Sequence, residues 1–310
     1  RRRLVTLPAS ALLPHAPFPA IFPPPWHCRC SAPPDGRCRA SVTYYPRTPR
    51  VVPILVKLLT LARDLQRRKG RERQHRFVAE GVRTVEALLA SPLTVTGVLV
   101  TDALPGQARG LALLQQAETR GVPVQVVTGD ELASASDTDA PQGVLAVADI
   151  PSAASLALDA GARYLVLDAL QDPGNVGTVV RTAAALGVTA TIALPGTVDF
   201  WNAKVVRSSM GALFHHRVAT MEWNELAAFL AQHRVALWAA DLKGDPLPEV
   251  AAGALPERLA LVVSNEGAGL SPHVAAAVER RLRIPMTHTV ESFNVAAAAA
   301  IVLYALGVAQ

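Results

Sequence analysis

Residues 164–194 read YLVLDALQDPGNVGTVVRTAAALGVTATIAL, in which two short apolar runs flank a polar turn and a helix-forming segment. The runs Tyr164–Leu167 and Thr191–Leu194 are largely apolar at consecutive positions, as strands buried on both faces are. Between them, Val176–Leu186 has the composition of a helix. A strand, a helix and a second strand in this order predict parallel strands joined by a helical crossover, so we expect an α/β fold.

The same alternation continues to the end of the chain. Further strands are expected at 214–219, 235–240, 259–263 and 282–284, and helices at 203–211, 224–233, 272–280 and 294–306. A shorter alternation precedes it, with strands expected at 77–80, 95–100, 124–127 and 142–148 and helices at 81–90 and 111–120. We therefore expect a smaller N-terminal α/β domain over residues 51–150 and a larger C-terminal domain over residues 151–310, joined by a linker at 149–162.

Composition assigns the basic charge mainly to one end of the chain. The 310 residues are 50% hydrophobic and carry a net charge of +5. Residues 1–50 hold eight arginines and one acidic residue, Asp35, so the remaining residues have 22 basic against 24 acidic side chains. Residues 1–50 also hold 11 of the 24 prolines, and we expect this segment to be disordered. Attraction to a nucleic acid must then come from a local patch.

The three cysteines, Cys28, Cys30 and Cys38, all lie in that first segment. The rest of the chain cannot form disulfides, which favours a reducing compartment, and we expect a cytoplasmic protein. Although His27 is adjacent, the spacing is not the paired CxxC pattern of zinc sites, so we expect no metal. The apolar stretch 295–309 is shorter than the roughly 20 residues that cross a bilayer. The arginine-rich start leaves a targeting peptide open as an alternative.

A basic cluster closes residues 51–76 and is the local patch with the highest positive charge. We expect six of its side chains to contact a nucleic-acid backbone: Arg67, Arg68, Lys69, Arg71, Arg73 and Arg76. At helical spacing these residues cover more than one face, which suits a phosphate backbone. A solvated helix surface with no ligand is the alternative interpretation of the same pattern.

Three polar loops each follow a buried strand and lead into a helix. They read QDPGNVG at 171–177, with Arg181 on the helix that follows, SNEGAGLS at 264–271, and IPMTHTVESFNVA at 284–296. Loops at strand ends line the ligand crevice of an open α/β sheet. Each loop taken alone also has a structural explanation. Asn175, Ser292 and Asn294 are residues that commonly cap helices, and glycine-rich turns such as the second loop are common.

Together, the loops resemble, in order and in spacing, the three motifs of the SpoU (TrmH) family of RNA methyltransferases. The motifs are N-x-G-x-x-x-R-T-A at 175–183, S-N-E-G-x-G-L at 264–270 and I-P-M-x-x-x-V-E-S-x-N-V-A at 284–296. The resemblance covers about residues 163–310 and, more loosely, 76–148. There, Arg76–Gly81 resembles the start of a small substrate-recognition domain that many members carry.

The resemblance implies a trefoil knot in the C-terminal domain, a homodimer with its active site near the subunit interface, and transfer of a methyl group from S-adenosylmethionine to a ribose 2'-OH of RNA. It implies that the methyl donor contacts Ser264, Glu266, Gly267, Ile284, Met286 and Phe293. It implies that the catalytic residues are Arg181, Asn175, Glu266, Ser292 and Asn294. A guanidinium stays protonated in proteins, so we expect Arg181 to hold the adjacent phosphate and polarise the 2'-OH rather than act as a base.

Two other functions remain open from the sequence. One is a non-catalytic RNA-binding or ribosome-assembly protein on the same fold. The other is an enzyme of the same superfamily that methylates a base nitrogen. A separate N-terminal recognition domain favours ribosomal RNA over transfer RNA as the substrate.

Overall fold

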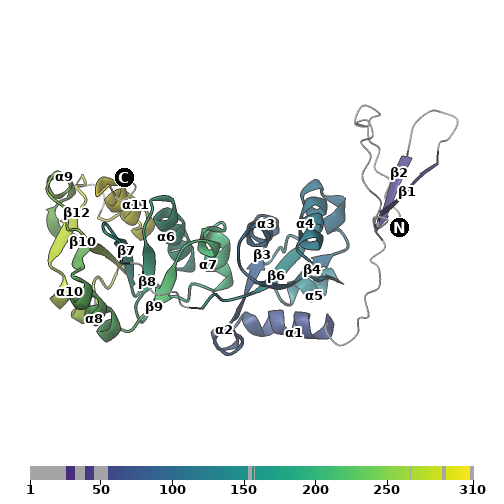
Figure 1. Cartoon of the computed structure of the whole chain (residues 1–310), viewed down its shortest axis with the longest axis horizontal. Helices are drawn as coiled ribbons and strands as arrows, with labels where there is room; N and C mark the ends of the chain where they lie inside the picture. Colours follow the sequence, from purple (N-terminus) through teal and green to yellow (C-terminus); the bar gives the residue numbers. More distant parts are fainter. Residues whose placement is uncertain are drawn as a thin grey trace. The chain divides into compact units, whose positions relative to one another are not determined.

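The computed structural model describes residues 26–31, 39–44, 55–152, 156, 158–265, 267–287 and 291–307, in two units, 1–54 and 55–310 (Figure 1). In the first unit, β1 (Trp26–Ser31) pairs antiparallel with β2 (Arg39–Tyr44). The expectation of disorder throughout residues 1–50 is therefore wrong for these two strands. Neither contains any of the segment's prolines, so nothing in them prevents ladder formation. The rest of that segment lies outside the described residues.

A six-stranded parallel sheet forms the centre of the C-terminal half, as expected. Its strands are β7 (Arg163–Asp168), β8 (Ala190–Ala193), β9 (Val218–Thr220), β10 (Ala236–Pro246), β11 (Leu259–Ser264) and β12 (Arg280–Arg283). Their order is β12-β10-β11-β7-β8-β9, and each pairing is parallel. The carboxyl ends of the strands therefore meet at one edge of the sheet.

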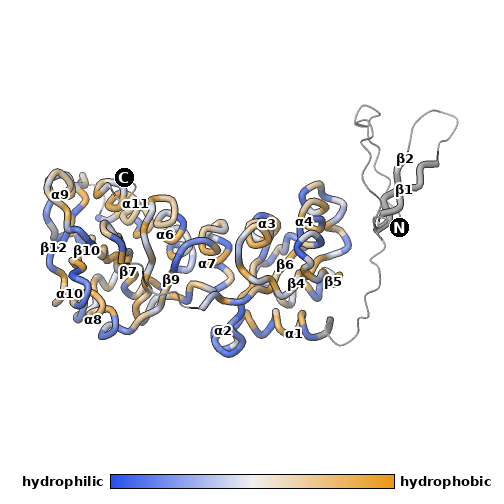
Figure 2. The backbone as a smooth tube through the Cα atoms, in the orientation of Figure 1, coloured by the Kyte–Doolittle hydropathy of each residue, from blue (hydrophilic) through white to orange (hydrophobic). Residues whose placement is uncertain are grey.

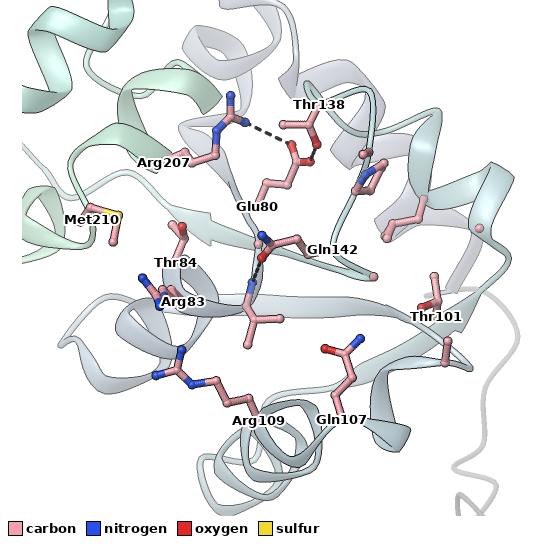
Figure 3. Close-up of a pocket in the computed structure, with 18 residues that line it drawn as sticks. Glu80, Arg83, Thr84, Thr101, Gln107, Arg109, Thr138, Gln142, Arg207 and Met210 are labelled. Atoms are coloured by element: carbon pink, nitrogen blue, oxygen red, sulfur yellow. Dashed lines mark hydrogen bonds and ion pairs between the residues drawn. The ribbon is translucent and has the colours of Figure 1, made fainter.

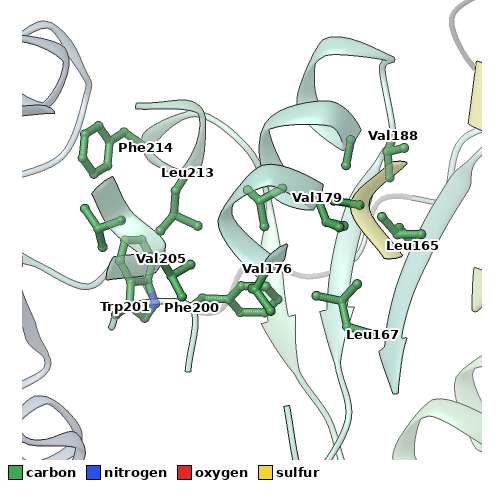
Figure 4. Close-up of a cluster of buried hydrophobic side chains, with 14 of the residues drawn as sticks. Leu165, Leu167, Val176, Val179, Val188, Phe200, Trp201, Val205, Leu213 and Phe214 are labelled. Atoms are coloured by element: carbon green, nitrogen blue, oxygen red, sulfur yellow. The ribbon is translucent and has the colours of Figure 1, made fainter. Parts of the chain in front are cut away.

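Helices cover both faces of this sheet. They are α6 (Pro173–Ala185), α7 (Ala203–Ser208), α8 (Trp223–His233), α9 (Leu247–Ala251), α10 (Pro272–Ala277) and α11 (Val295–Ala305). Successive side chains of β7 point to opposite faces. Leu165 and Leu167 pack in a core with α6, α7 and α11 (Figure 4), whereas Tyr164 and Val166 pack in a second core with α8 and α10. Burial on both faces explains the continuous apolar strands.

The N-terminal half is built on a smaller, mixed sheet. Its strands are β3 (Arg76–Glu80), β4 (Val95–Thr101), β5 (Val124–Val127) and β6 (Val144–Asp149), in the order β3-β6-β4-β5. Its helices are α1 (Leu55–Leu65), α2 (Arg68–Gln74), α3 (Val82–Ala90), α4 (Ala108–Thr119) and α5 (Gly129–Ala133), with a 3-10 turn η2 (Leu104–Gly106). In the tube coloured by hydropathy, α2 is hydrophilic (Figure 2).

The two halves of residues 55–310 share one apolar core. The ring of Phe77 on β3 lies 4.6 Å from that of Trp201 and 5.9 Å from that of Phe214, both in the C-terminal half. This contact explains a difference from the sequence expectation of a strand at 214–219. A 3-10 turn, η3 (Ala212–Phe214), holds Phe214 in the shared core, and β9 starts only at Val218.

Among the described helices, none is both long enough and apolar enough to cross a bilayer. The same part of the chain holds no group of three or more His, Cys, Asp or Glu side chains placed to bind a metal ion. Of the cysteines, Cys38 lies outside the described residues.

Candidate active site

The first predicted motif forms the N-terminus of α6, directly after β7. Asp172 caps this helix, because its Oδ1 accepts a hydrogen bond from the backbone N–H of Asn175 at 2.9 Å. Pro173 occupies the first turn, where its missing N–H costs nothing. The cap that the sequence assigned to Asn175 therefore belongs to Asp172, and the side chain of Asn175 is free for other contacts.

The third motif meets the first through a pair of asparagines. Asn294 caps α11, since its Oδ1 accepts from the backbone N–H of Ala296 at 3.0 Å. This cap turns the Nδ2 of Asn294 outward, where it donates to the Oδ1 of Asn175 at 2.9 Å. Two candidate catalytic residues that are 119 positions apart in the chain are thus in direct contact.

The second motif is a loop at the end of β11 that is held in place by its own asparagine. The Oδ1 of Asn265 accepts from the backbone N–H groups of Gly267 at 2.9 Å and Ala268 at 3.2 Å. Its backbone carbonyl accepts from the N–H of Gly269, also at 2.9 Å. Ser264 and Gly267 are placed at the carboxyl edge of the sheet by this turn, while Glu266 lies outside the described residues.

Sequence reasoning missed one residue of this edge, Asp168. It ends β7, its side chain is only 2% exposed, and its Oδ2 accepts from the N–H of Ser271 at 2.7 Å. Its carbonyl oxygen accepts from the N–H of Asn265 at 3.2 Å. Asp168 thereby fixes both ends of the second loop. An acidic residue that ends an otherwise apolar strand was the available signal.

The remaining cofactor candidates surround the same edge. Ile284 and Met286 directly follow β12 and are partly buried, whereas Phe293 is 38% exposed. Residues 288–290, between them, lie outside the described residues. Partly buried apolar side chains, a serine hydroxyl and a glycine-rich turn at one edge of the sheet suit a ligand with flat apolar faces and polar edges, such as an adenosyl group.

Arg181 is exposed and is not aligned with the asparagine pair. It lies six residues after Asn175 on α6, which places it about 9 Å further along the helix and about 120° around it. Arg181 shares an exposed stripe with Thr178 and Ala185. The structure of one chain therefore brings Asn175 and Asn294 together, with Ser292 two residues away in the chain, but does not bring Arg181 to them.

The structure corrects one of the six residues assigned to RNA. Arg71 is only 4% exposed, and its Nε donates to Asp199 Oδ2 at 2.7 Å. Its Nη1 donates to the backbone carbonyls of Leu65 at 2.8 Å and Gln66 at 3.1 Å. The guanidinium group of Arg71 is buried and bonded within the protein, because α2 turns back closely against the end of α1. Arg71 is therefore a structural residue that links the two halves.

The other five residues of the basic cluster are accessible. Three of them form ion pairs: Arg68 with Glu72 at 2.8 Å, Arg73 with Asp64 at 2.7 Å and Arg76 with Asp149 at 2.8 Å. Arg67 and Lys69 are exposed at the start of α2. Partly neutralised in this way, the cluster is a weaker positive surface than the sequence indicated.

Both halves of the chain match families of known proteins. Residues 162–304 match the model of the SpoU rRNA Methylase family, and residues 58–146 match that of the MRM3-like substrate binding domain. The chain is 34% identical over 245 residues to the 23S rRNA (guanosine(2553)-2'-O)-methyltransferase RlmP of Bacillus subtilis, which covers 79% of this chain and 93% of that protein.

Solved structures agree with this match. A putative RNA methyltransferase of the TrmH family from Porphyromonas gingivalis is 31% identical, with a TM-score of 0.68 over 81% of this chain and 96% of that one. The SpoU methyltransferase AviRb from Streptomyces viridochromogenes, in complex with the cofactor AdoMet, is 25% identical, with a TM-score of 0.70 over 81% of this chain and 97% of that one.

The fold and these matches define an RNA methyltransferase that depends on S-adenosylmethionine. The chain belongs to the SpoU rRNA Methylase family. The family, the enzyme class, the cofactor and the α/β fold class expected from the sequence are thereby confirmed. The trefoil knot stays a prediction.

Proposed function

We propose that this enzyme methylates the 2'-oxygen of a ribose in ribosomal RNA. The observation that carries the proposal is the contact between Asn175 and Asn294, which joins two motifs at the carboxyl edge of the sheet. Support for the substrate comes from the relatives, since RlmP of Bacillus subtilis and RlmB of Bordetella pertussis, 31% identical, are both named as 23S rRNA guanosine 2'-O-methyltransferases.

The residues at the edge of the sheet fit the proposed cofactor. When bound, S-adenosylmethionine would supply an electrophilic methyl group for the ribose 2'-oxygen, its sulfur would leave as the neutral thioether of S-adenosylhomocysteine, and the hydroxyl proton would pass to solvent water. In this proposal Ser264, Gly267, Ile284, Met286 and Phe293 hold the cofactor. Glu266, which the structure does not describe, is assigned to the same site by its place in the motif.

We assign the catalytic roles according to what each side chain can donate or accept. Asn175 and Asn294, each oriented by a fixed partner, position the ribose, and Ser292 lies close enough in the chain to assist them. Arg181 keeps its charge and holds the neighbouring phosphate with its planar fork. Alignment of the two reacting atoms then supplies much of the rate acceleration.

A homodimer is part of the same proposal. The exposed side of α11 carries Ala297, Ile301 and Tyr304, spaced as one helical stripe, and Tyr304 is 76% exposed. This stripe lies on the helix that packs against α6, whose own exposed stripe includes Arg181. A second copy on this face would bury the apolar side chains and bring Arg181 to the subunit interface.

Residues 51–150 act in this proposal as the recognition domain, with Arg67, Arg68, Lys69, Arg73 and Arg76 facing the RNA backbone. A cytoplasmic location belongs to the proposal as well, and the absence of cysteine from residues 51–310 supports it.

The test is incubation of the purified protein with methyl-labelled S-adenosylmethionine and unmodified ribosomal RNA, followed by alkaline hydrolysis. A 2'-O-methyl group blocks cleavage of the next phosphodiester bond, so we expect the label in alkali-resistant dinucleotides. Label on a free base would instead show a base methyltransferase. Absence of label from every RNA, despite measurable cofactor binding, would indicate a non-catalytic RNA-binding protein.

A further inference from the structure

A cleft of about 920 Å³ opens in the N-terminal half, well away in sequence from the three motifs (Figure 3). Its walls come from the turn between β3 and α3, the start of α4, the loop before β6 and, from the C-terminal half, α7. A volume of this size suits one small ligand of a few rings, and is too small for a nucleic-acid duplex.

Two arginines line one side of the cleft, and Glu86 partly neutralises one of them, Arg109. Arg83 on α3 and Arg109 on α4 are both exposed, and both line it. They are close to each other in the fold, because Arg109 Nε lies 3.8 Å from Oε1 of Glu86, which is one helical turn after Arg83. Figure 3 shows both guanidinium groups on the same side of the cleft. Guanidinium groups on one side of a cleft suit the oxygens of a phosphodiester group.

The carboxylate that lines the cleft does not cancel this charge. Glu80 is only 2% exposed and accepts hydrogen bonds from the hydroxyls of Ser136 and Thr138 and, at 3.0 Å, from the N–H of Asp137. Arg207 Nη1 lies 3.8 Å from its Oε2. Glu80 is therefore occupied with holding the loop before β6, and its charge is compensated by Arg207.

Two exposed amide side chains line the cleft, and a hydrogen bond holds one of them, Gln142, in place. The Oε1 of Gln142 accepts from the backbone N–H of Val82 at 3.1 Å, which leaves its Nε2 group available as a donor toward the cleft (Figure 3). Gln107 is exposed on the wall contributed by the start of α4. Amide side chains of this kind form hydrogen bonds with the edges of nucleobases.

We infer that this cleft binds one unpaired nucleotide of the RNA substrate, with Arg83 and Arg109 on its phosphates and the Gln142 and Gln107 amides on its base. Bases of single-stranded loops can be splayed out into such a pocket, whereas paired bases cannot. The inference rests on the proposed function, because it assigns a second contact to the same RNA. It gives the N-terminal half a specific binding element beyond the general attraction of α2.

The first experiment removes charge from the mouth of the cleft in the full-length protein. We compare Arg83→Gln/Arg109→Gln with Arg234→Gln/Lys243→Gln, which removes the same charge from exposed positions of the C-terminal half. Binding of transcribed, unmodified large-subunit ribosomal RNA is measured over a series of salt concentrations. We expect the cleft variant to bind about tenfold more weakly and the slope of log affinity against log salt to fall by about 2. An equal effect of the control pair would overturn the inference.

A second variant blocks the cleft without changing charge. Ala140 is exposed and lines it, so Ala140→Phe fills part of the space while leaving the core intact. We expect KM for RNA to rise several-fold while kcat and cofactor affinity stay within about twofold, since a remote contact contributes equally to ground and transition states. Unchanged RNA affinity in this variant and in the cleft variant would disprove the inference.

Further outcomes distinguish failure of the inference from failure of the proposed function. A competition experiment distinguishes RNA from free nucleotides as the ligand of the cleft. Wild-type protein that binds RNA through the cleft but transfers no methyl group would refute the proposed function and keep the inference. Normal methylation by both cleft variants, with unchanged RNA affinity, would refute the inference and keep the proposed function. Free guanosine monophosphate or cytidine monophosphate should compete only weakly. Tight, stoichiometric binding of either one in the cleft would indicate a free-nucleotide site and overturn the assignment to RNA.

Discussion

The carboxyl edge of the large sheet and the cleft of the small half obtain their polar groups in different ways. At the edge, each loop is a contiguous motif whose side chains and backbone bond to each other, as Asn265 does with Gly267 and Ala268. In the cleft, Arg83, Gln107, Gln142 and Arg207 come from four separate segments. A site made of contiguous loops is visible in a sequence, whereas a site assembled from distant elements requires the fold.

The largest predicted effect of a substitution is at Arg181, in the first motif of the large half. Arg181→Ala should lower kcat on the order of 1,000-fold, because the phosphate and the developing charge lose their fixed donor. Binding of S-adenosylmethionine, followed by calorimetry, should change by less than about twofold. Arg234→Ala, also exposed, is the matched control and should leave kcat unchanged. Parallel loss of cofactor binding and turnover would show that Arg181 belongs to the cofactor site instead.

Arg71 tests whether the two halves depend on each other. Arg71→Met removes the partner of Asp199 and the donor to two backbone carbonyls, so the free energy of unfolding should fall by about 3 kcal/mol. The control is Arg73→Met, whose side chain is 65% exposed, and which should cost less than about 1 kcal/mol. Urea unfolding measures both. Equal losses in the two variants would contradict the structural role of Arg71.

Gly177 tests how tightly α6 must pack to hold Asn175 in place. A Cβ at this position would lie 1.9 Å from Ser208 Oγ and 2.7 Å from the backbone oxygen of Val205. Gly177→Ala should therefore cost about 2 kcal/mol in thermal or urea unfolding and lower kcat, since α7 must move away from α6. Adding Ser208→Ala should restore only part of the loss, because the Val205 carbonyl remains. Full recovery in the double variant would show that only the hydroxyl obstructs the helix.

At neutral pH the smallest predicted effect is that of His216, which makes the large half sensitive to acid. Desolvation lowers the pKa of His216 from 6.5 to about 4, and its Nε2 lies 2.8 Å from Thr191 Oγ1. Between these pKa values the unfolded chain binds more protons than the folded chain, so stability falls as the pH is lowered from about 6.5 to about 4. The full loss over this range is about 3 kcal/mol, and His216→Gln should flatten this part of the profile. A profile that is the same in wild type and variant would rule out this assignment.

Much of the architecture followed from local patterns. The strand expected at 124–127 and the helix expected at 224–233 match β5 and α8 to within a residue, because the apolar spacing and flanking residues are local. The short helices α5 and α9 were missed, since five residues give too little periodicity to detect. The strand expected at 214–219 was displaced because Phe214 is recruited to the core shared with Phe77.

The candidate site, too, was predictable from the sequence in part and required the tertiary structure for the rest. The sequence alone determined the three motifs, and with them the enzyme family and the residues of the carboxyl edge, because each motif is a short contiguous segment with a fixed spacing. Only the tertiary structure decided that Asn294 contacts Asn175, that Arg71 is buried against Asp199, and that Arg207 meets Glu80 beside a cleft. These contacts join residues roughly 120 positions or more apart, and their geometry depends on how the helices pack rather than on any local propensity.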